Sequence, residues 1–387
     1  MYKILTLNNI SLVGLDQFSR NKYEVASEIV HPDAVVVRSF DMHKMELPAT
    51  LKAIARAGAG VNNIPVDKCT ERGIVVFNTP GANANSVKEL VLTGMLISSR
   101  KIVQGINWAK SLIGKGDEVT KLIEKGKSNF EGPELKGKKL GVIGLGAIGV
   151  MVANSAVSLG MQVSGYDPYI SVESAWYLST RVKRAKVLES LLADSDYISI
   201  HVPLVDSTRA MINKERFAIM KKGMRLLNFS RNGIVHNEDL KAALADGTIA
   251  VYVTDFPDEE LLRLDNVVGL PHLGASTPEA EDNCASMAVS QLIDFLEYGN
   301  IKNAVNFPEC ELPPSGKRRL LVANRNVPSM VGQIATILAQ EKINIADMIN
   351  KHRSDIAYNI IDIDSDLTGE HIRKINTIDG VIMVRII

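Results

Sequence analysis

Cysteine is scarce in this chain: three cysteines occur among 387 residues. Three thiols cannot all pair with one another, and their spacing matches no metal-binding motif. We therefore expect Cys69, Cys284 and Cys310 to be reduced structural thiols, and we expect no metal site.

The chain also lacks net charge and long apolar runs. Lysine plus arginine and aspartate plus glutamate both number 44, which gives no reason to expect nucleic acid or a membrane surface as a partner. No apolar run reaches the ~18 residues that a membrane-spanning helix needs. Residues 1–6 read as a strand rather than as a signal peptide, so we expect a cytoplasmic protein.

A glycine-rich turn is the most informative feature that the sequence does contain. The apolar stretch 139–143 runs into Gly144, Gly146 and Gly149, which form a G-x-G-x-x-G pattern. A helix-compatible stretch and a second apolar strand follow, and this β-α-β context is typical of dinucleotide binding. In such a turn the first glycine permits the tight bend, the second lets the backbone approach a pyrophosphate, and the third lets the helix pack on the strand.

An acidic residue, Asp167, ends the second strand of this β-α-β unit. A carboxylate at this place accepts a hydrogen bond from the ribose 2′-OH of a dinucleotide and repels a 2′-phosphate. The sequence therefore predicts NAD rather than NADP as the cofactor.

The order of segments indicates several domains, as the length of 387 residues also does. Residues 1 to about 80 read as a small α/β unit, and the strands from the fingerprint to about 270 as a parallel, doubly wound sheet. A helical stretch at 277–299 precedes the proline-rich segment 306–316, which breaks every periodicity. Residues 318–387 then read strand, helix, strand, strand, helix, strand, an order that predicts a ferredoxin-like module.

Polar residues follow four strands of the predicted sheet, at the edge where open α/β sheets bind ligands. Hydride transfer from a 2-hydroxy acid needs a base for the hydroxyl proton, a cation for the carboxylate and a carboxylate that orients the base. His272, Arg231 and Glu259 are the candidates for these three roles. His201 also ends a strand, but we interpret it as structural because the residues after it resemble a cofactor-contacting wall.

Several segments together resemble a known family: residues 37–39, 56–64, 78–80, the fingerprint, 228–231 and 271–277. With these motifs the chain resembles the D-isomer-specific 2-hydroxyacid dehydrogenases, of the type with a C-terminal ACT domain. The implied fold class is α/β, with a Rossmann-type doubly wound sheet inserted in a smaller flavodoxin-like domain and a ferredoxin-like (ACT) α+β domain at the end. The implied domains are a substrate-binding domain, an NAD-binding domain, a linker and a regulatory domain, at residues 1–95 with 276–305, 96–275, 306–317 and 318–387.

The resemblance also implies an activity, the NAD-dependent oxidation of 3-phospho-D-glycerate to 3-phosphohydroxypyruvate, which is the first step of L-serine biosynthesis. Arg231 would bind the carboxylate and polarise the carbonyl, and His272 would be the acid/base. Arg38 would take the phosphate, while Arg56, Gly58 and Asn62 would hold the substrate. The implied cofactor contacts are Gly144, Gly146, Ala147, Ile148, Gly149, Asp167, Pro203, Thr208, Ser230, Asp255 and Gly274.

Two places depart from the family pattern. Counting from Asp255 selects Glu260 as the carboxylate that orients His272, whereas anchoring on the Phe-Pro pair that follows Asp255 selects Glu259, so both stay open. Ala147 stands where many relatives carry arginine, which leaves more of the phosphate binding to backbone N–H groups.

The resemblance implies a regulatory role for the last domain. Asn326 and Asn344 match the asparagines that bind the effector in serine-inhibited relatives, and Asn324 replaces a histidine of that pattern. Serine is therefore a candidate effector, and a purely structural dimerisation module is the alternative. A homodimer or homotetramer is implied in either case.

Two other functions stay open at this point. One is the same chemistry on another acid, as in a glyoxylate or hydroxypyruvate reductase, against which Arg38 and the ACT-like module argue. The other is an NAD-sensing binding protein like the corepressors of this superfamily, against which the pair of Arg231 and His272 argues.

Overall fold

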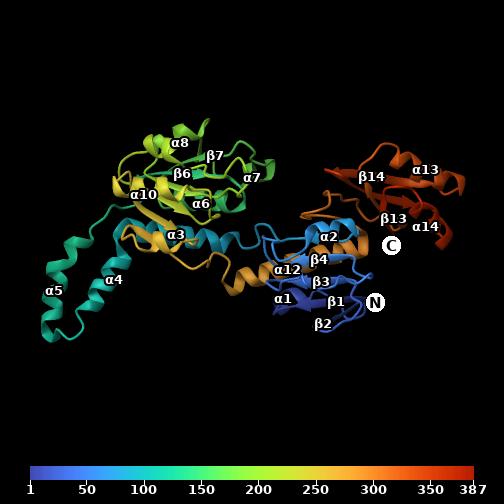
Figure 1. Cartoon of the computed structure of the whole chain (residues 1–387), viewed down its shortest axis with the longest axis horizontal. Helices are drawn as coiled ribbons and strands as arrows, with labels where there is room; N and C mark the ends of the chain where they lie inside the picture. Colours follow the sequence, from blue (N-terminus) through green and yellow to red (C-terminus); the bar gives the residue numbers. More distant parts are fainter. The chain divides into compact units, whose positions relative to one another are not determined.

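The computed structural model describes residues 1–387 and divides them into two compact units. The first unit joins Met1–Asn83 to Pro278–Ile387, and the second is Ala84–Thr277. Figure 1 draws the whole chain and labels many of the elements named below. The second unit begins at residue 84 rather than at the expected 96, because the helix that starts there packs on the sheet of that unit.

A five-stranded parallel sheet forms the N-terminal part of the first unit, in the order β2-β1-β3-β4-β5. This strand order confirms the predicted flavodoxin-like topology. Helix α12 covers one face of the sheet, and α2 packs on the other. The bounds are β1 Tyr2–Leu7, α1 Leu12–Leu15, β2 Tyr23–Ala26, β3 Ala34–Val37, β4 Ala53–Arg56, α2 Val66–Glu71, β5 Val75–Phe77 and α12 Pro278–Tyr298.

A seven-stranded parallel sheet forms the second unit, in the order β12-β11-β10-β9-β6-β7-β8. The order reverses between β6 and β9, as in the predicted Rossmann-type sheet. Helices α8 to α11 cover one face, and α3 and α6 cover the other. The strand bounds are β6 Lys139–Ile143, β7 Gln162–Tyr166, β8 Lys183–Arg184, β9 Tyr197–Ile200, β10 Met224–Asn228, β11 Ile249–Thr254 and β12 Val267–Gly269.

Most helices of the second unit alternate along the chain with its strands, but the helices between residues 84 and 130 come before the glycine-rich turn. The residue that separates α3 from α4 is Lys101, whose φ of +47° ends the first helix. The helix bounds are α3 Ala84–Arg100, α4 Ile102–Ser111, η1 Gly116–Glu118, α5 Val119–Gly126, η2 Lys127–Phe130, α6 Ala147–Ser158, α7 Val172–Tyr177, α8 Leu188–Asp194, α9 Lys214–Ala218, α10 Asn237–Ala245 and α11 Glu259–Leu262.

The C-terminal module of the first unit is a four-stranded antiparallel sheet in the order β14-β15-β13-β16, with two helices. This arrangement confirms the predicted ferredoxin-like unit. Helices α13 and α14 cover one face of its sheet. The bounds are β13 Arg318–Arg325, α13 Met330–Gln340, β14 Ile345–Arg353, β15 Ile356–Ile363, α14 Gly369–Asn376 and β16 Val381–Ile386.

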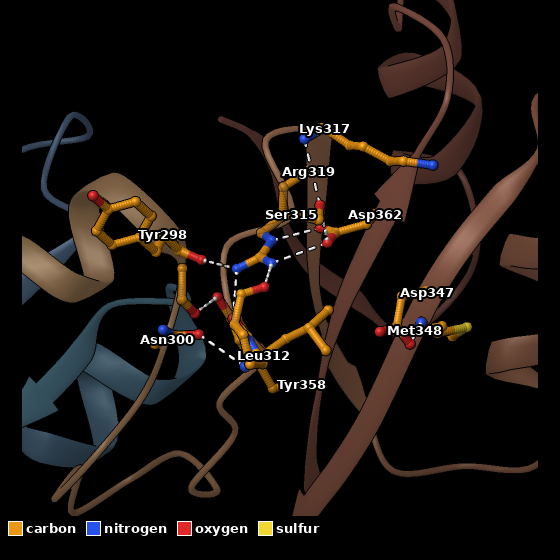
Figure 2. A network of polar contacts seen from close by, with 12 residues as sticks. Tyr298, Asn300, Leu312, Ser315, Lys317, Arg319, Asp347, Met348, Tyr358 and Asp362 are labelled. Atoms are coloured by element: carbon orange, nitrogen blue, oxygen red, sulfur yellow. Dashed lines mark hydrogen bonds and ion pairs between the residues drawn. The ribbon is translucent and has the colours of Figure 1, made fainter.

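The other face of the module's sheet shares a hydrophobic core with α12 and the N-terminal sheet. A buried ion pair stands at this junction, because Arg319 Nε donates to Asp362 Oδ1 at 2.6 Å and their side chains are only 5% and 1% exposed. The same guanidinium donates to the carbonyl oxygens of Tyr298, Leu312 and Pro313, as Figure 2 shows for Tyr298 and Leu312. Arg319 Nη2 also donates to Asp362 Oδ2 at 3.1 Å, so all five N–H donors of Arg319 have acceptors.

The segment 306–317, expected to be a linker, is only partly exposed. Phe307, Cys310 and Leu312 are buried in the core that α12 and the module share. Cys310 also forms an antiparallel bridge with Ile301. The proline-rich segment therefore packs against the core between the two sheets of the first unit and is not an exposed flexible linker. No helix anywhere in the structure combines the length and apolarity that crossing a membrane requires.

Candidate active site

The glycine-rich turn has a distinct steric reason for each of its three glycines. Gly144 has a φ of +90°, and a Cβ there would lie 2.5 Å from the carbonyl oxygen of His201. A Cβ on Gly149 would lie 1.9 Å from the oxygen of Gly144, so only glycine lets α6 pack this closely. Gly146 has no atom within 4 Å of its ideal Cβ position and leaves open space above the turn.

The start of helix α6 fits an anion. Gly146 is the N-cap residue and has no side chain to satisfy the first N–H groups of the helix. These N–H groups and the positive end of the helix dipole favour a phosphate. Gly146 and Ala147 are exposed and Ile148 is half-buried, so the turn is accessible.

Asp167 is fixed beside this turn by two backbone hydrogen bonds. Its Oδ2 accepts from Leu145 N and its Oδ1 from Tyr169 N, both at 2.8 Å. The carboxylate thus lies directly after β7 with its orientation set by the glycine-rich turn itself. This geometry fits a ribose 2′-OH and disfavours a 2′-phosphate.

Two loops that follow β9 and β10 are held together. Thr208 Oγ1 donates to the carbonyl oxygen of Pro203 at 2.6 Å and closes the first loop. Ser230 Oγ donates to the carbonyl oxygen of Val202 and links the second loop to the first. The predicted cofactor residues Pro203, Thr208 and Ser230 therefore belong to one connected wall.

Asp255, at the end of β11, is the most unusual polar residue of this edge. It is 3% exposed, and its Oδ1 has no hydrogen-bond partner. Burial raises the pKa of the Asp255 carboxyl, while the positive charges of His272 and Arg231 oppose that rise. An ideal Cβ on Gly274 would lie 3.6 Å from Asp255 Oδ2, so this carboxylate lies close to the Gly274 backbone.

Arg231 and His272 therefore each lie within electrostatic reach of Asp255. Arg231 and His272 are exposed, whereas Asp255 is buried. The His272 ring packs against Phe256, with centroids 4.6 Å apart and planes inclined at 51°. The structure thus brings together two of the three predicted catalytic residues and adds an aromatic ring that limits the orientation of the imidazole.

The structure does not bring Glu259 to His272. Glu259 forms an ion pair with Arg263, and Glu260 forms one with Lys241. The physical reason is local: the loop after β11 is short, and Asp258 caps α11 by accepting from Leu261 N at 2.8 Å. Both glutamates consequently lie on α11, and Asp255 is the carboxyl group on which the charges of His272 and Arg231 act.

His201 has a structural environment, as interpreted from the sequence. Its Nε2 pairs with Ser199 Oγ at 2.8 Å, and its backbone N donates to Ile143 O at 2.7 Å. Burial lowers the pKa of His201 to about 4, so the imidazole is neutral at physiological pH.

The predicted substrate residues of the first unit lie on the loops after β3 and β4. Arg56 Nε donates to the carbonyl oxygen of Arg38 at 3.1 Å. Gly58 has a φ of +148°, and a Cβ there would lie 1.9 Å from Arg56 Nη1, so its missing side chain makes room for the guanidinium. Asn62 is exposed and its carbonyl oxygen contacts His43 Nε2 at 3.0 Å.

One contact in this region was missed by the sequence reasoning. Arg38 Nη1 lies 2.7 Å from Glu281 Oε1 on α12. No spacing signal links two residues so far apart in the chain, and only the tertiary fold brings them together.

The three predicted effector residues of the module have different surroundings. Asn324 is 1% exposed and its Oδ1 accepts from Asn359 Nδ2 at 2.8 Å, so it is not available to a ligand at the surface. Asn326 and Asn344 are exposed. Asn326 follows the end of β13, whereas Asn344 precedes β14, which runs in the same direction as β13. The two asparagines therefore lie at opposite ends of the sheet.

Residues 92–274 match the family model described as D-isomer specific 2-hydroxyacid dehydrogenase, NAD binding domain. The crystal structure of cofactor (NAD+) bound 3-phosphoglycerate dehydrogenase from Entamoeba histolytica is 27% identical, with a TM-score of 0.61, and the match covers 79% of this chain and 98% of that one.

Relatives named D-3-phosphoglycerate dehydrogenase extend the match over most of the chain. The Methanocaldococcus jannaschii protein is 37% identical over 339 residues, which is 85% of this chain and 61% of the relative. The Haemophilus influenzae protein is 33% identical over 355 residues, which is 89% of this chain and 83% of the relative. The chain thus spans about three fifths of the archaeal relative and most of the bacterial one. Taken with the Rossmann-type sheet and its glycine-rich turn, these matches show that the chain belongs to the D-isomer specific 2-hydroxyacid dehydrogenase family.

Proposed function

We propose that this protein catalyses the NAD-dependent oxidation of 3-phospho-D-glycerate to 3-phosphohydroxypyruvate, the first step of L-serine biosynthesis. The observation that carries the proposal is the grouping of Arg231, Asp255 and His272 beyond the strand ends of a dinucleotide-binding sheet. The relatives named D-3-phosphoglycerate dehydrogenase supply the substrate.

The residues present fit NAD. The turn from Gly144 to Gly149 has open space and free N–H groups for the pyrophosphate, and Asp167 suits the ribose. The unpartnered Oδ1 of Asp255 is a buried acceptor that needs a donor, and the carboxamide N–H of a nicotinamide is such a donor. The remaining predicted contacts, Ala147, Ile148, Pro203, Thr208, Ser230 and Gly274, belong to the same proposal. When bound, NAD accepts the hydride from the substrate carbon.

The side chains of the second unit carry the acid/base chemistry. Arg231 binds the substrate carboxylate through its guanidinium fork and stabilises negative charge on the oxygen of the developing carbonyl. His272 takes the hydroxyl proton as the hydride leaves. Phe256 limits the orientation of the imidazole, and the buried charge of Asp255 stabilises the imidazolium that forms. In this proposal Asp255 replaces Glu259 as the carboxylate that supports His272.

The two units have different tasks in this proposal. Residues 84–277 bind NAD, and the N-terminal part of the first unit binds substrate through Arg38, Arg56, Gly58 and Asn62. Arg38 takes the phosphate because guanidinium geometry suits it. The C-terminal module is regulatory.

We further propose that serine is an effector and that the chain works as a homodimer or homotetramer in the cytoplasm. Asn326 and Asn344 lie at opposite ends of β14, a distance of roughly 30 Å, so one ligand reaches both only between two copies of the module. Helix α4 supports oligomerisation independently. It has no buried residue and exposes Ile102, Val103 and Ile106 by 41%, 38% and 50%.

Turnover of purified protein tests the proposed activity. We expect NADH to form from NAD with 3-phospho-D-glycerate, and His272→Ala to reduce kcat by roughly 100-fold or more. Glu259→Gln is the matched control, because Glu259 pairs only with Arg263 and should retain wild-type kcat. Full activity of His272→Ala would refute the assigned base, and loss of activity in Glu259→Gln would restore the role first predicted for that glutamate.

A further inference from the structure

Arg38, the proposed phosphate ligand, already has an anionic partner within the chain. Its Nη1 lies 2.7 Å from Oε1 of Glu281, in the first turn of α12. The two side chains are 35% and 43% exposed, so ligands in solution can reach the pair. A guanidinium binds carboxylate and phosphate through the same N–H groups, so a phosphorylated ligand competes with Glu281 for Arg38.

The backbone of Arg38 is fixed by its neighbours. Its carbonyl oxygen accepts hydrogen bonds from Arg56 Nε at 3.1 Å and from Asn63 Nδ2 at 3.3 Å. The next two backbone N–H groups, of Ser39 and Phe40, both donate to Asn8 Oδ1. Only the side chain of Arg38 therefore remains able to move between partners.

Helix α12, which carries Glu281, is fixed at both ends. Near its start, Ser11 Oγ donates to Asp282 Oδ1 at 2.5 Å. At its end, Arg319 donates to the carbonyl oxygen of Tyr298, and Tyr358 Oη donates to that of Gly299, both at 2.8 Å (Figure 2). Arg385 reaches the carbonyl oxygens of the preceding turn. The carboxylate of Glu281 is thus attached to a helix held in place by the C-terminal module.

We infer that Glu281 is a resident counter-anion for Arg38. It occupies the guanidinium in the free enzyme, yields it to the phosphate of a bound ligand, and takes it back as that ligand leaves. This inference rests on the proposed function for the identity of the ligand, a phosphorylated 2-hydroxy acid. Glu281 consequently weakens the binding of phosphorylated ligands selectively, because a ligand without phosphate leaves the ion pair intact.

An exposed ion pair of this kind alters an equilibrium by about fivefold at most. For Glu281→Gln we therefore expect the KM for 3-phospho-D-glycerate and the inhibition constant of inorganic phosphate each to fall about fivefold. The KM for D-glycerate stays unchanged, and kcat does not rise. Glu279→Gln is the matched control, because it removes an exposed carboxylate from the same helical turn with no ion pair to Arg38. It should alter none of these constants.

The double variant Arg38→Gln with Glu281→Gln tests whether the effect of Glu281 depends on Arg38. In the Arg38→Gln background, Glu281→Gln should have no effect on the KM or on phosphate inhibition. A KM that rises or stays constant in Glu281→Gln would overturn the inference, as would an equal effect of Glu279→Gln or an effect that survives in Arg38→Gln.

Binding of inorganic phosphate to the full chain, followed by calorimetry without substrate, separates this inference from the proposed function. If phosphoglycerate is not oxidised but Glu281→Gln still tightens phosphate binding about fivefold, the activity fails and the counter-anion stands. If phosphoglycerate is oxidised but phosphate binding is unchanged by Glu281→Gln, the counter-anion fails alone.

Discussion

At the residue scale, polar side chains are buried at two places, and the consequences differ because only one of the two sets has all its hydrogen-bond partners. Asp255 has an orphaned carboxylate oxygen at the proposed cofactor site, whereas Arg319 and Asp362 satisfy each other at the junction of the C-terminal module. An unmet buried acceptor costs free energy unless a ligand supplies the donor. A fully satisfied pair instead specifies one arrangement of the elements that it joins.

The buried ion pair gives the first stability prediction. Arg319→Met leaves Asp362 buried without its partner and should lower the free energy of unfolding by about 3–5 kcal/mol. Arg319→Met combined with Asp362→Leu removes the stranded carboxylate and should recover part of that loss. Urea denaturation of both variants measures the effect. A loss under about 1 kcal/mol in the single variant would contradict the interpretation of Arg319 as a structural clamp.

The environment of His201 predicts a dependence of stability on pH. The pKa is about 4 in the folded protein and about 6.5 in an unfolded chain, so the unfolded chain binds the proton first as the pH falls. Between pH 7.5 and pH 5, His201 should therefore cost about 2 kcal/mol of stability, and the cost should stop growing below pH 4. His201→Gln should lose this part of the pH dependence in urea denaturation. An unchanged pH dependence would show that the imidazole is protonated in the fold.

At the scale of elements, the contact between β6 and α6 depends on two glycines with opposite surroundings. Gly149→Ala places a methyl group 1.9 Å from the Gly144 oxygen, which should displace α6 and lower both stability and NAD affinity. Gly146→Ala meets no atom within 4 Å, so the fold should be retained while NAD affinity falls roughly tenfold or more, about 1.4 kcal/mol. Thermal unfolding and NAD titration separate the two effects. Equal losses of stability in both variants would contradict the packing role assigned to Gly149.

Helices and strands were predicted well where apolar periodicity within the segment itself identifies them. The order of strands and helices in residues 318–387 agrees with the sequence, because apolar periodicity and turn residues define each element. The two-residue edge strand β8, Lys183–Arg184, is polar and exposed and carried no such signal. The boundary at Ala84 was also missed: the expected boundary at residue 96 falls inside α3, and only tertiary packing assigns the whole helix to the second unit.

Sequence motifs predicted which residues lie at the candidate site but not all of the contacts between them. The strand ends located Arg231, Asp255 and His272, since a parallel sheet places them at one edge. The identity of the carboxylate near His272 was not predictable, because it depends on how the short loop to α11 directs Glu259 towards Arg263. The surroundings of Asn324 were not predictable for a related reason: a motif position does not reveal that a side chain is buried against Asn359.

At the scale of the whole molecule, the C-terminal module belongs to the same hydrophobic core as the N-terminal sheet. Leu321 of β13 and Ile4 of β1 are both fully buried in it. Leu321→Ala should cost about 2–5 kcal/mol and reduce amide protection in β1 and β13 together. Hydrogen exchange followed by mass spectrometry measures this coupling. Loss of protection confined to β13 would show that the module folds independently.

The central claim concerns the reaction, and a substrate comparison with purified enzyme tests it most directly. Initial rates of NADH formation are measured with NAD and either 3-phospho-D-glycerate or D-glycerate. The account predicts that 3-phospho-D-glycerate has the higher kcat/KM by roughly 10-fold or more, since only this substrate engages Arg38, and that Arg38→Gln abolishes the preference. Equal or higher kcat/KM for D-glycerate, or no turnover of either acid despite NAD binding, would contradict it.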